Sequence, residues 1–444
     1  MRSFLILVCF NFSLIYAQEI KKDVFGFATS NTFTYCDIND TFFVNKVVEL
    51  SPKILRFPGG AVGNFYHFGK LGYGFDFAEI DKYHDGKFPK RSRGLERSRI
   101  KKNQDYDYIR DFILLAKKTN AKVVLVANLF SNNNDIILMI EEMLRNNIQI
   151  VGVELGSELS NRSYYNNGYT IEKYIVSSKK CSDKIKKKYP NIKTAIVAAP
   201  LGKHKGHRHN IWNEKLSKLD FYDAIIIHSY AKVIKGKDQY GKMITEVNEF
   251  DNKIDLFENF KNRIIEYLTI TFPKEIQDYN NIFSKPIWIT EWNLQMSKTT
   301  GNTLFQSLFV ANFLLEIMSN NKTNTIDVLT YHNLGGRDFS GSIFRNENDI
   351  LNIQSAYYPL RFLGEVFNYN ISKITKKQKN RAFSYSFFDK NKMLKLRYNI
   401  DWDKNLFQYI NYDDFSNPDT NNLHSLQLYD SPDRFGNFET TKND

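Results

Sequence analysis

The stretch IVGVELGSE, at residues 150–158, is an apolar run that closes on a carboxylate, Glu158. A second stretch, KPIWITEWN at residues 285–293, has the same form and carries Glu291 after its apolar run. Both read as buried parallel strands, because a strand covered on both faces is apolar almost throughout. Each strand is expected to end on its glutamate. The two glutamates lie far apart in the sequence, so only the fold can bring them together.

Runs of this kind recur along the chain, and we count eight, at residues 24–28, 54–57, 122–127, 150–155, 194–198, 224–228, 287–291 and 327–331. Segments with a helical spacing of apolar residues lie between them, at residues 105–118, 135–145, 171–188, 256–270 and 303–318. This alternation is typical of βαβ units and a parallel sheet. Eight units favour an α/β fold closed into a (β/α)8, or TIM, barrel. A doubly wound open sheet is the alternative, but no glycine-rich phosphate turn follows the first run.

The residue pattern of the chain changes after Tyr357. Short aromatic and aliphatic runs at residues 382–388, 393–398 and 406–410 are separated by Asn, Asp and Lys clusters, which predicts antiparallel strands. We therefore expect a barrel over residues 18–355 and a small C-terminal β-sandwich-like domain with a polar tail over residues 356–444.

The first 17 residues have the form of a secretory signal peptide. Arg2 precedes a mostly apolar segment, residues 4–14, and Ala17 supplies a small residue before the expected cut. The mature chain is then secreted, or periplasmic or extracellular. The apolar run is too short to span a bilayer, so no membrane insertion is expected. Cys36 and Cys181 remain in the mature chain and read as two buried thiols, although sequence alone leaves their pairing open.

The formal net charge is +12, which suggests an anionic partner such as an acidic polysaccharide, a membrane surface or nucleic acid. A lysine-rich solvated surface is the plainer explanation of the same number. Two basic loops, residues 87–102 and 203–209, follow predicted strands and would form subsites for sulfate or carboxylate groups. The histidines of the second loop are too poorly spaced, with no acid nearby, to favour a metal site, and no cofactor is expected.

Residues at the carboxyl ends of the strands build the active site of such a barrel. In this chain these positions hold polar or aromatic residues, namely Arg56, Asn64, Asn128, Ser157, Glu158, His228, Tyr230, Glu291, Trp292 and His332. Two carboxylates that face each other across the barrel mouth are the apparatus of glycoside hydrolysis. They would also repel phosphates, which argues against nucleic acid as the partner.

Three motifs carry a family resemblance: LRFPGG at residues 55–60, ELGSE at 154–158 and EWN at 291–293. With them the chain resembles the retaining glycoside hydrolases of clan A, nearest to the α-L-arabinofuranosidase and heparanase-like families, over roughly residues 23–365. The resemblance implies that Glu158 is the general acid/base and Glu291 the nucleophile, with carboxyl groups about 5–5.5 Å apart. Glu158 is then expected to be protonated at rest, its pKa raised by the ionised Glu291.

The remaining strand-end residues are expected to serve this pair. Arg56 would keep Glu291 ionised, and Tyr230 would donate a hydrogen bond to it. His228 and His332 would contact sugar hydroxyls, and Trp292 would form a wall of the site. Asn64 and Asn128 are further candidates for substrate binding, whereas Glu154 reads as a buried, paired structural residue.

Ser157 departs from the resemblance, because these families place Asn immediately before the acid/base, where it binds the hydroxyl next to the anomeric carbon. A serine hydroxyl is shorter and offers a single donor. The substrate could be substituted at that position, Asn161 or Asn128 could take over the contact, or activity could be lost. The expected function is hydrolysis of a polysaccharide or oligosaccharide, with an anionic glycan favoured. The alternative is a non-catalytic carbohydrate-binding protein on a degenerate barrel.

Overall fold

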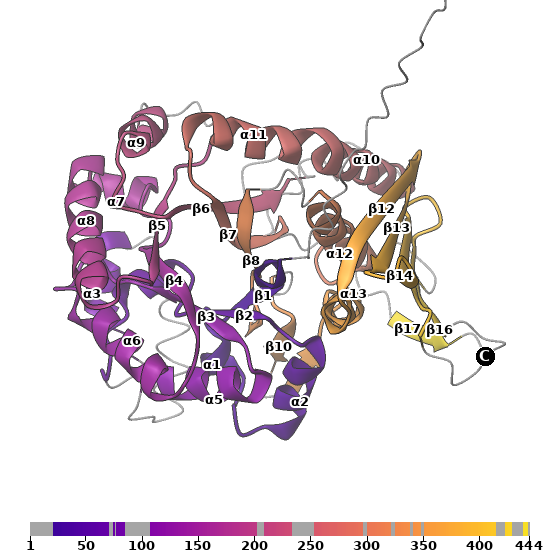
Figure 1. The fold of residues 1–444 in the computed structure, drawn as a ribbon, viewed down its shortest axis with the longest axis horizontal. Helices are drawn as coiled ribbons and strands as arrows, with labels where there is room; N and C mark the ends of the chain where they lie inside the picture. The colour runs from indigo at the N-terminus through magenta and orange to yellow at the C-terminus, as the bar shows by residue number, and fades with distance from the viewer. Residues whose placement is uncertain are drawn as a thin grey trace, which may run out of the picture.

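The computed structural model describes residues 21–70, 74–75, 77–84, 107–201, 208–232, 253–295, 300–320, 325–337, 341–347, 350–413, 422–428 and 438–442. The predicted signal peptide and both basic loops, apart from Arg208 and His209, lie outside these ranges. Within them the chain forms a ring of helices around a barrel of strands, with a separate sheet beside it (Figure 1).

The barrel consists of β1 (Gly26–Ala28), β2 (Ile54–Phe57), β3 (Lys122–Val126), β4 (Ile150–Leu155), β5 (Lys193–Val197), β6 (Ala224–Ala231), β7 (Ile287–Leu294) and β8 (Ile326–Tyr331). Each strand pairs in parallel with the next, and β1 pairs with β8 to close the ring. In this register Phe27 lies opposite Leu55 on one side and Tyr331 on the other. The closed barrel predicted from the alternating runs is confirmed.

The helices of the chain are α1 (Thr32–Tyr35), α2 (Thr41–Leu50), α3 (Phe77–His84), α5 (Ile109–Thr119), α6 (Asn134–Arg145), α7 (Arg162–Asn166), α8 (Ile171–Lys188), α9 (Arg208–Ser217), α10 (Lys253–Glu266), α11 (Phe272–Ile282), α12 (Leu304–Ser319) and α13 (Tyr357–Gly364). Short turns of 3-10 or π-helix add η1 (Lys22–Val24), η2 (Ala61–Phe65), η4 (Tyr267–Thr271) and η5 (Glu365–Asn368). Most helices cover the outside of the barrel, and α12 is buried along nearly its whole length because the C-terminal sheet covers its other side.

The C-terminal sheet is antiparallel and follows the order of the chain: β12 (Ile371–Lys379), β13 (Ala382–Asp389), β14 (Leu394–Asp401), β15 (Leu406–Asn411), β16 (Asn422–Leu428) and β17 (Phe438–Lys442). A smaller sheet, β9 (Gly335–Gly336), β10 (Phe344–Glu347) and β11 (Ile350–Ile353), precedes it. Polar bonds tie the larger sheet to α12: Asn312 Nδ2 donates to the Tyr385 hydroxyl at 2.7 Å, and Trp402 Nε1 donates to Asn312 Oδ1 at 2.9 Å. The predicted fold class, a TIM barrel with a small C-terminal β domain, is confirmed.

The two strands that carry the glutamates do not end on them. The strand β4 stops at Leu155, and Glu158 lies three residues later with a φ of 50°, in the left-handed region. Gly156 makes this turn, since its φ is 85° and a Cβ there would overlap Leu159. The strand β7 instead runs on through Glu291 to Leu294, with its register against β8 shifted between Ile289 and Trp292. The expectation that both strands end on a carboxylate was therefore wrong in both cases.

Two simpler expectations concern the thiols and the bilayer. Cys36 and Cys181 are both buried thiols, as expected. Among the residues that the structure describes, no helix combines the length and the apolar composition needed to cross a membrane.

Candidate active site

The carboxyl ends of β2, β4, β6, β7 and β8 bring one cluster of charged side chains together in the barrel mouth. At its centre are Glu158, His228 and Glu291, whose side chains each contribute an oxygen or nitrogen atom, all within 4.8 Å of one another. Arg56, Tyr230 and His332 each approach Glu291 from a different strand or loop. The chain thus joins two glutamates that are more than a hundred residues apart.

Glu291 is held on both of its oxygens. Arg56 Nη1 donates to Oε1 at 2.8 Å, and the Tyr230 hydroxyl donates to Oε2 at 2.7 Å. The Nδ1 atoms of His228 and His332 each lie 3.5 Å from Oε2. Burial alone would raise the pKa of this carboxyl, but the surrounding positive charges and the tyrosine hydrogen bond outweigh burial and hold the pKa well below its ordinary value. Glu291 is therefore an ionised carboxylate.

Arg56 is itself fixed by a second carboxylate. Its Nε and Nη2 donate to the two oxygens of Glu154 at 2.6 and 2.8 Å, and both side chains are fully buried. The planar guanidinium suits this two-point pairing, which leaves Nη1 aimed at Glu291. Burial lowers the pKa of Arg56, but the charges of the two glutamates raise it by more than burial lowers it, so the guanidinium stays charged. The expectation that Glu154 is buried and paired is confirmed.

Glu158 is held differently from Glu291, and its side chain is 37% exposed. Its Oε1 lies 3.0 Å from His228 Nδ1, and its Oε2 accepts a bond from Asn161 Nδ2 at 2.8 Å. Burial and the charge of Glu291 favour the neutral acid, but the hydrogen bond and charge of His228 outweigh them and lower the pKa of Glu158. The charge of Glu291 raises the pKa of Glu158 as expected, but the expectation that this pKa is raised overall was wrong.

His228 stands between the two carboxylates. Burial lowers the pKa of His228, but the charges of Glu291 and Glu158 and the hydrogen bond to Glu158 outweigh burial and raise it. Thr290 Oγ1 lies 3.3 Å from its other nitrogen, Nε2. Thr290 was not predicted as a site residue, because a threonine inside an apolar strand gives no sign that it contacts a histidine.

Asn64 and Ser157 hold the turn after β4 in place. The Asn64 amide pairs with the backbone of Ser157 at both ends, accepting from its N–H at 2.8 Å and donating to its C=O at 2.7 Å. The Ser157 hydroxyl accepts from Arg56 Nη2 at 3.3 Å. Both side chains are fully buried, so their observed partners belong to the protein.

Two expected substrate contacts lie away from the carboxylates. Asn128 is 4% exposed and bonds to backbone at both ends of its amide, to Tyr66 O at 3.2 Å and from Phe130 N at 2.9 Å. Trp292 is 1% exposed, and its ring packs 4.8 Å from that of Phe313 in α12. The expectation of Trp292 as a wall of the site fails because alternate residues of a strand face opposite sides, and Trp292 faces the helices while Glu291 faces the barrel mouth.

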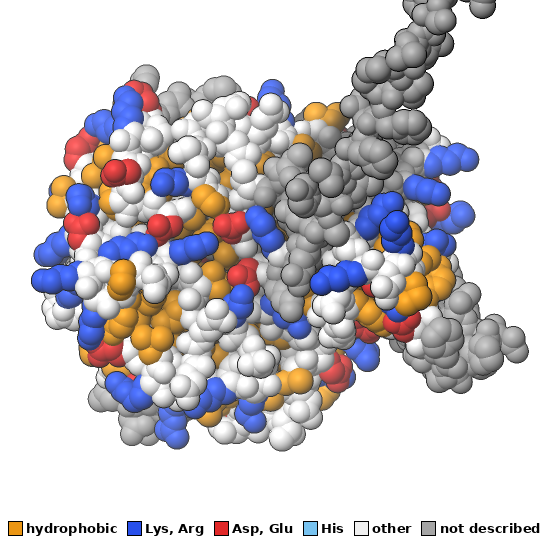
Figure 2. All heavy atoms as spheres, in the orientation of Figure 1, with side chains coloured by type: hydrophobic (Ala, Val, Ile, Leu, Met, Phe, Trp, Pro, Cys, Tyr) orange, Lys and Arg blue, Asp and Glu red, His pale blue; other side chains and the backbone are white. Residues whose placement is uncertain are grey.

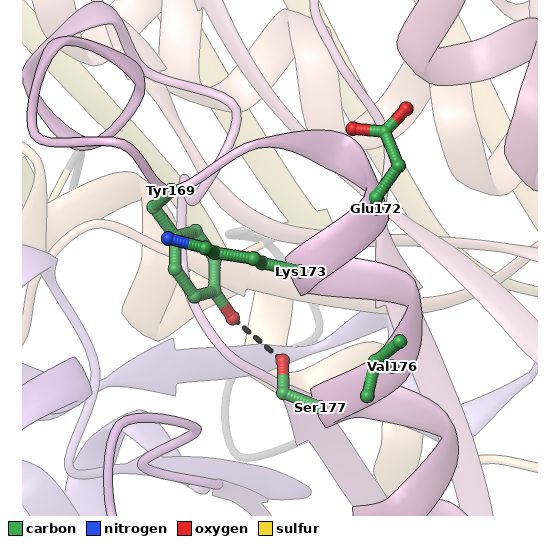
Figure 3. A pocket seen from close by; sticks show the side chains of 5 residues that line it. All are labelled: Tyr169, Glu172, Lys173, Val176 and Ser177. Carbon is green, nitrogen blue, oxygen red and sulfur yellow. Dashed lines mark hydrogen bonds between the residues drawn. The ribbon is translucent and has the colours of Figure 1, made fainter.

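A shallow hollow of about 350 Å³ lies on the outer helical layer and has no connection with this chemistry. Figure 3 shows its lining at the start of α8, where the Tyr169 hydroxyl and Ser177 Oγ are bonded at 2.7 Å. Glu172, which also lines the hollow, pairs with Lys215. We assign no function to it.

No protein-family model and no curated protein matches the chain. Its fold is similar to that of a GH51 arabinofuranosidase from Xanthomonas axonopodis pv. citri, with 9% identity, a TM-score of 0.58 and coverage of 89% of this chain and 83% of that one. It is also similar to an α-L-arabinofuranosidase from Thermotoga maritima, at 13% identity, TM-score 0.53 and coverage of 90% and 84%. For a family 51 α-L-arabinofuranosidase from Bifidobacterium longum the values are 10%, 0.56, 90% and 84%.

At such low identities the likeness concerns the fold. The resemblance inferred from the three motifs is confirmed at that level: the chain has the barrel architecture of the clan A glycoside hydrolases.

Proposed function

We propose that the protein is a secreted retaining glycoside hydrolase that cleaves a polysaccharide or oligosaccharide by double displacement. The observation that carries this proposal is the approach of Glu158 and Glu291, with side-chain oxygens within 4.8 Å of each other. Retaining glycosidases keep their two carboxyl groups about 5–5.5 Å apart, whereas inverting enzymes need about 6.5–9.5 Å to admit a water molecule. The separation supports a retaining mechanism.

Glu291 takes the part of the nucleophile in this proposal. Its low pKa keeps it ionised, and Arg56 and Tyr230 fix its orientation. In the first step a Glu291 oxygen bonds to the anomeric carbon as the glycosidic C–O bond breaks, and the leaving oxygen takes a proton from Glu158. In the second step water gives its proton to Glu158 and its oxygen to the anomeric carbon, which releases Glu291.

Glu158 must carry a proton before the first step. Its Oε1 lies 3.0 Å from His228 Nδ1, so a proton can pass between the two groups along this contact. As Glu291 bonds to the sugar it loses its negative charge, which lowers the pKa of Glu158 and favours its ionised form, the base that the second step requires.

The choice of an anionic glycan rests on charge. The chain carries a formal net charge of +12, and its basic loops follow predicted strands on the catalytic face. In the described part of the chain, lysines also gather on the edge strand β12 (Figure 2), where Lys373, Lys377 and Lys379 are exposed, whereas Lys376 pairs with Glu316. These charges support a sulfated or uronic polymer over a neutral one.

The test is a panel of neutral and anionic glycans with detection of reducing-end products. The wild-type chain should cleave at least one glycan, and Glu291→Gln, which keeps the shape but removes the nucleophile, should cleave none. Glu79→Gln is the matched control, since Glu79 pairs with His67 away from the cluster and its loss should leave turnover intact. Wild-type rates from Glu291→Gln would end the assignment.

A non-catalytic carbohydrate-binding protein is the second candidate. Two observations favour it, the lowered pKa of Glu158 and the serine that stands where the resembling enzymes have asparagine. In that case the same panel would yield glycan binding by calorimetry with no product, and Glu291→Gln would bind as the wild type does.

A further inference from the structure

The histidine between the two glutamates has the geometry of a metal ligand. Glu158 Oε1 and Glu291 Oε2 lie 3.0 and 3.5 Å from the same ring nitrogen, Nδ1 of His228. Two donors of one tetrahedral zinc ion stand about 3.4 Å apart when the bonds are 2.0–2.1 Å long. Both distances are close to that value.

A second histidine in the chain makes the contrast. His67 also lies between two carboxylates, but Asp135 lies 3.1 Å from Nδ1 and Glu79 lies 2.9 Å from Nε2. These carboxylates occupy opposite sides of the ring, so no single ion can reach both together with the ring. Over the described residues, Glu158, His228 and Glu291 form the one group of metal-type side chains whose donors converge.

The formal charges of the cluster also suit a dication. Arg56 supplies one positive charge against the carboxylates of Glu154, Glu158 and Glu291, which leaves two negative charges when the imidazoles are neutral. Arg56 bonds to Glu154 through Nε and Nη2 and to Oε1 of Glu291 through Nη1. Glu291 Oε2 accepts from the Tyr230 hydroxyl and lies 3.5 Å from His228 Nδ1, so a second lone pair of this oxygen remains for an ion.

Access to the cluster comes through Glu158, whose side chain is 37% exposed and so gives an ion a route in. His332 Nδ1 lies 3.5 Å from Glu291 Oε2 but is not among the donors that converge, so a water molecule would complete the coordination shell.

We propose that Glu158, His228 and Glu291 bind one Zn²⁺ ion, with a water molecule in the fourth position, and that the bound ion reversibly inhibits hydrolysis. Imidazole nitrogens and carboxylate oxygens are the ligands that zinc accepts in proteins. The ion takes the place of the proton on His228 and occupies both glutamates. The inhibition rests on the proposed function, whereas the binding does not.

The experiment measures zinc binding to the purified full-length chain by calorimetry near pH 8, in a buffer free of phosphate and after chelator treatment. We expect one ion per chain. Glu158→Gln and His228→Gln should each weaken binding tenfold or more, and His67→Gln, which changes a histidine of opposed geometry, should leave affinity within twofold. Cobalt in place of zinc should give the visible absorption of a four-coordinate site in the wild type and lose it in Glu158→Gln.

Zinc binding that is absent, or that survives both cluster variants, overturns the proposal. A triple change of His204, His207 and His209 to Gln covers the other plausible ligands, and loss of binding in that variant alone would place the ion there instead. Where a cleaved glycan is known, zinc should abolish and EDTA restore its hydrolysis. Binding without any glycan cleavage would count against the proposed function but not against the site.

Discussion

The two glutamates of the site differ in the side chains that surround them, and these side chains give each glutamate its role. Arg56 and Tyr230 bond to Glu291, and His228 bonds to Glu158 and stands 3.5 Å from Glu291. Glu291 is therefore held as an ionised carboxylate, whereas Glu158 shares a proton with the imidazole of His228. These contacts join residues that are far apart in the sequence, so only the fold determines which side chains surround each glutamate.

The proton shared by Glu158 and His228 sets the basic limit of activity. The pKa of His228 is raised above 6.5, so the imidazolium, and with it the activity, should persist to a pH above that value and then decline. In His228→Gln the proton must reside on the carboxyl alone, and we expect the basic limb of kcat/KM to move to lower pH. A pH profile of both proteins on one cleaved glycan checks this. An unchanged basic limb would show that His228 is not the proton store.

Arg56 should matter for stability as well as for chemistry. Arg56→Met removes the partner of both Glu154 oxygens and one of the partners of Glu291, and a buried carboxylate left unpaired costs about 3–5 kcal/mol in the free energy of unfolding. It should also raise the pKa of Glu291, so that the acidic limb of activity moves to higher pH. Urea unfolding and a pH profile measure the two effects. In the control Arg56→Met/Glu154→Leu, one orphaned charge is removed, and part of the stability but none of the activity should return.

The turn after β4 carries Glu158, and a side chain from a different βα unit of the barrel holds this turn in place. Asn64 makes two bonds to the backbone of Ser157, and Gly156 supplies the positive φ that the turn needs. The motif ELGSE predicted a strand followed by a functional glutamate. The strand predicted at residues 150–155 has the bounds of β4, but the motif could not show how the turn after it is held, because the Asn64 bonds come from η2.

Replacing Asn64 by Ala tests this support. The change leaves a buried N–H and a buried C=O of Ser157 without partners, and each costs about 1–3 kcal/mol. We expect a lower free energy of unfolding and a loss in kcat larger than the change in KM, since Glu158 loses its position. Denaturant unfolding and steady-state kinetics give the two values. Wild-type kcat in a folded variant would mean that the turn holds its shape unaided.

His67 links α3 to α6 through Glu79 and Asp135, and this link depends on pH. The hydrogen bond that His67 donates to Asp135, together with Glu79, raises the pKa of His67 to about 8, while burial acts in the opposite direction. Because the folded-state pKa lies above the unfolded value, the stabilisation is fully present below about pH 6.5 and is lost as the pH rises to 8. We expect His67→Gln to cost about 2 kcal/mol at pH 6 and almost nothing at pH 9, measured by urea unfolding. An equal cost at both values would contradict the link.

Much of the architecture of the whole molecule could be predicted from the sequence, for physical reasons. Parallel strands buried on both faces are continuous apolar runs, so the eight barrel strands were visible, although β6 and β7 each run three residues further than expected. The edge strand β12 was missed because its exposed positions are lysines and only its inner side is covered. The direction of the Glu158 pKa shift was predicted wrongly because the sequence does not reveal that His228 contacts Glu158 across 70 residues.

The C-terminal sheet should unfold together with the barrel. Trp402 is fully buried, its ring lies 5.3 Å from that of Phe305, and its indole N–H bonds to Asn312 in α12. We expect Trp402→Ala to cost about 3–5 kcal/mol and to lower the midpoint of a single thermal transition. Calorimetry checks this, and a separate early transition for the sheet would contradict it.

The charge of the molecule yields a prediction about its substrate. If basic subsites bind an anionic glycan, KM should rise as salt is increased from 0.05 to about 0.5 M, because screening shortens the Debye length. Hydrolysis of a neutral glycan of similar length should respond little and serves as the control. A flat response for the anionic glycan would remove the reason for preferring it.

The most direct test of the central claim is the anomeric configuration of the first product, followed by proton NMR as a cleaved glycan is consumed. Carboxylates as close as Glu158 and Glu291 leave no room for a water molecule between base and sugar, so the account predicts that the configuration of the substrate is retained. A product that forms first in the opposite configuration would contradict the assignment of Glu291 as nucleophile and Glu158 as acid/base.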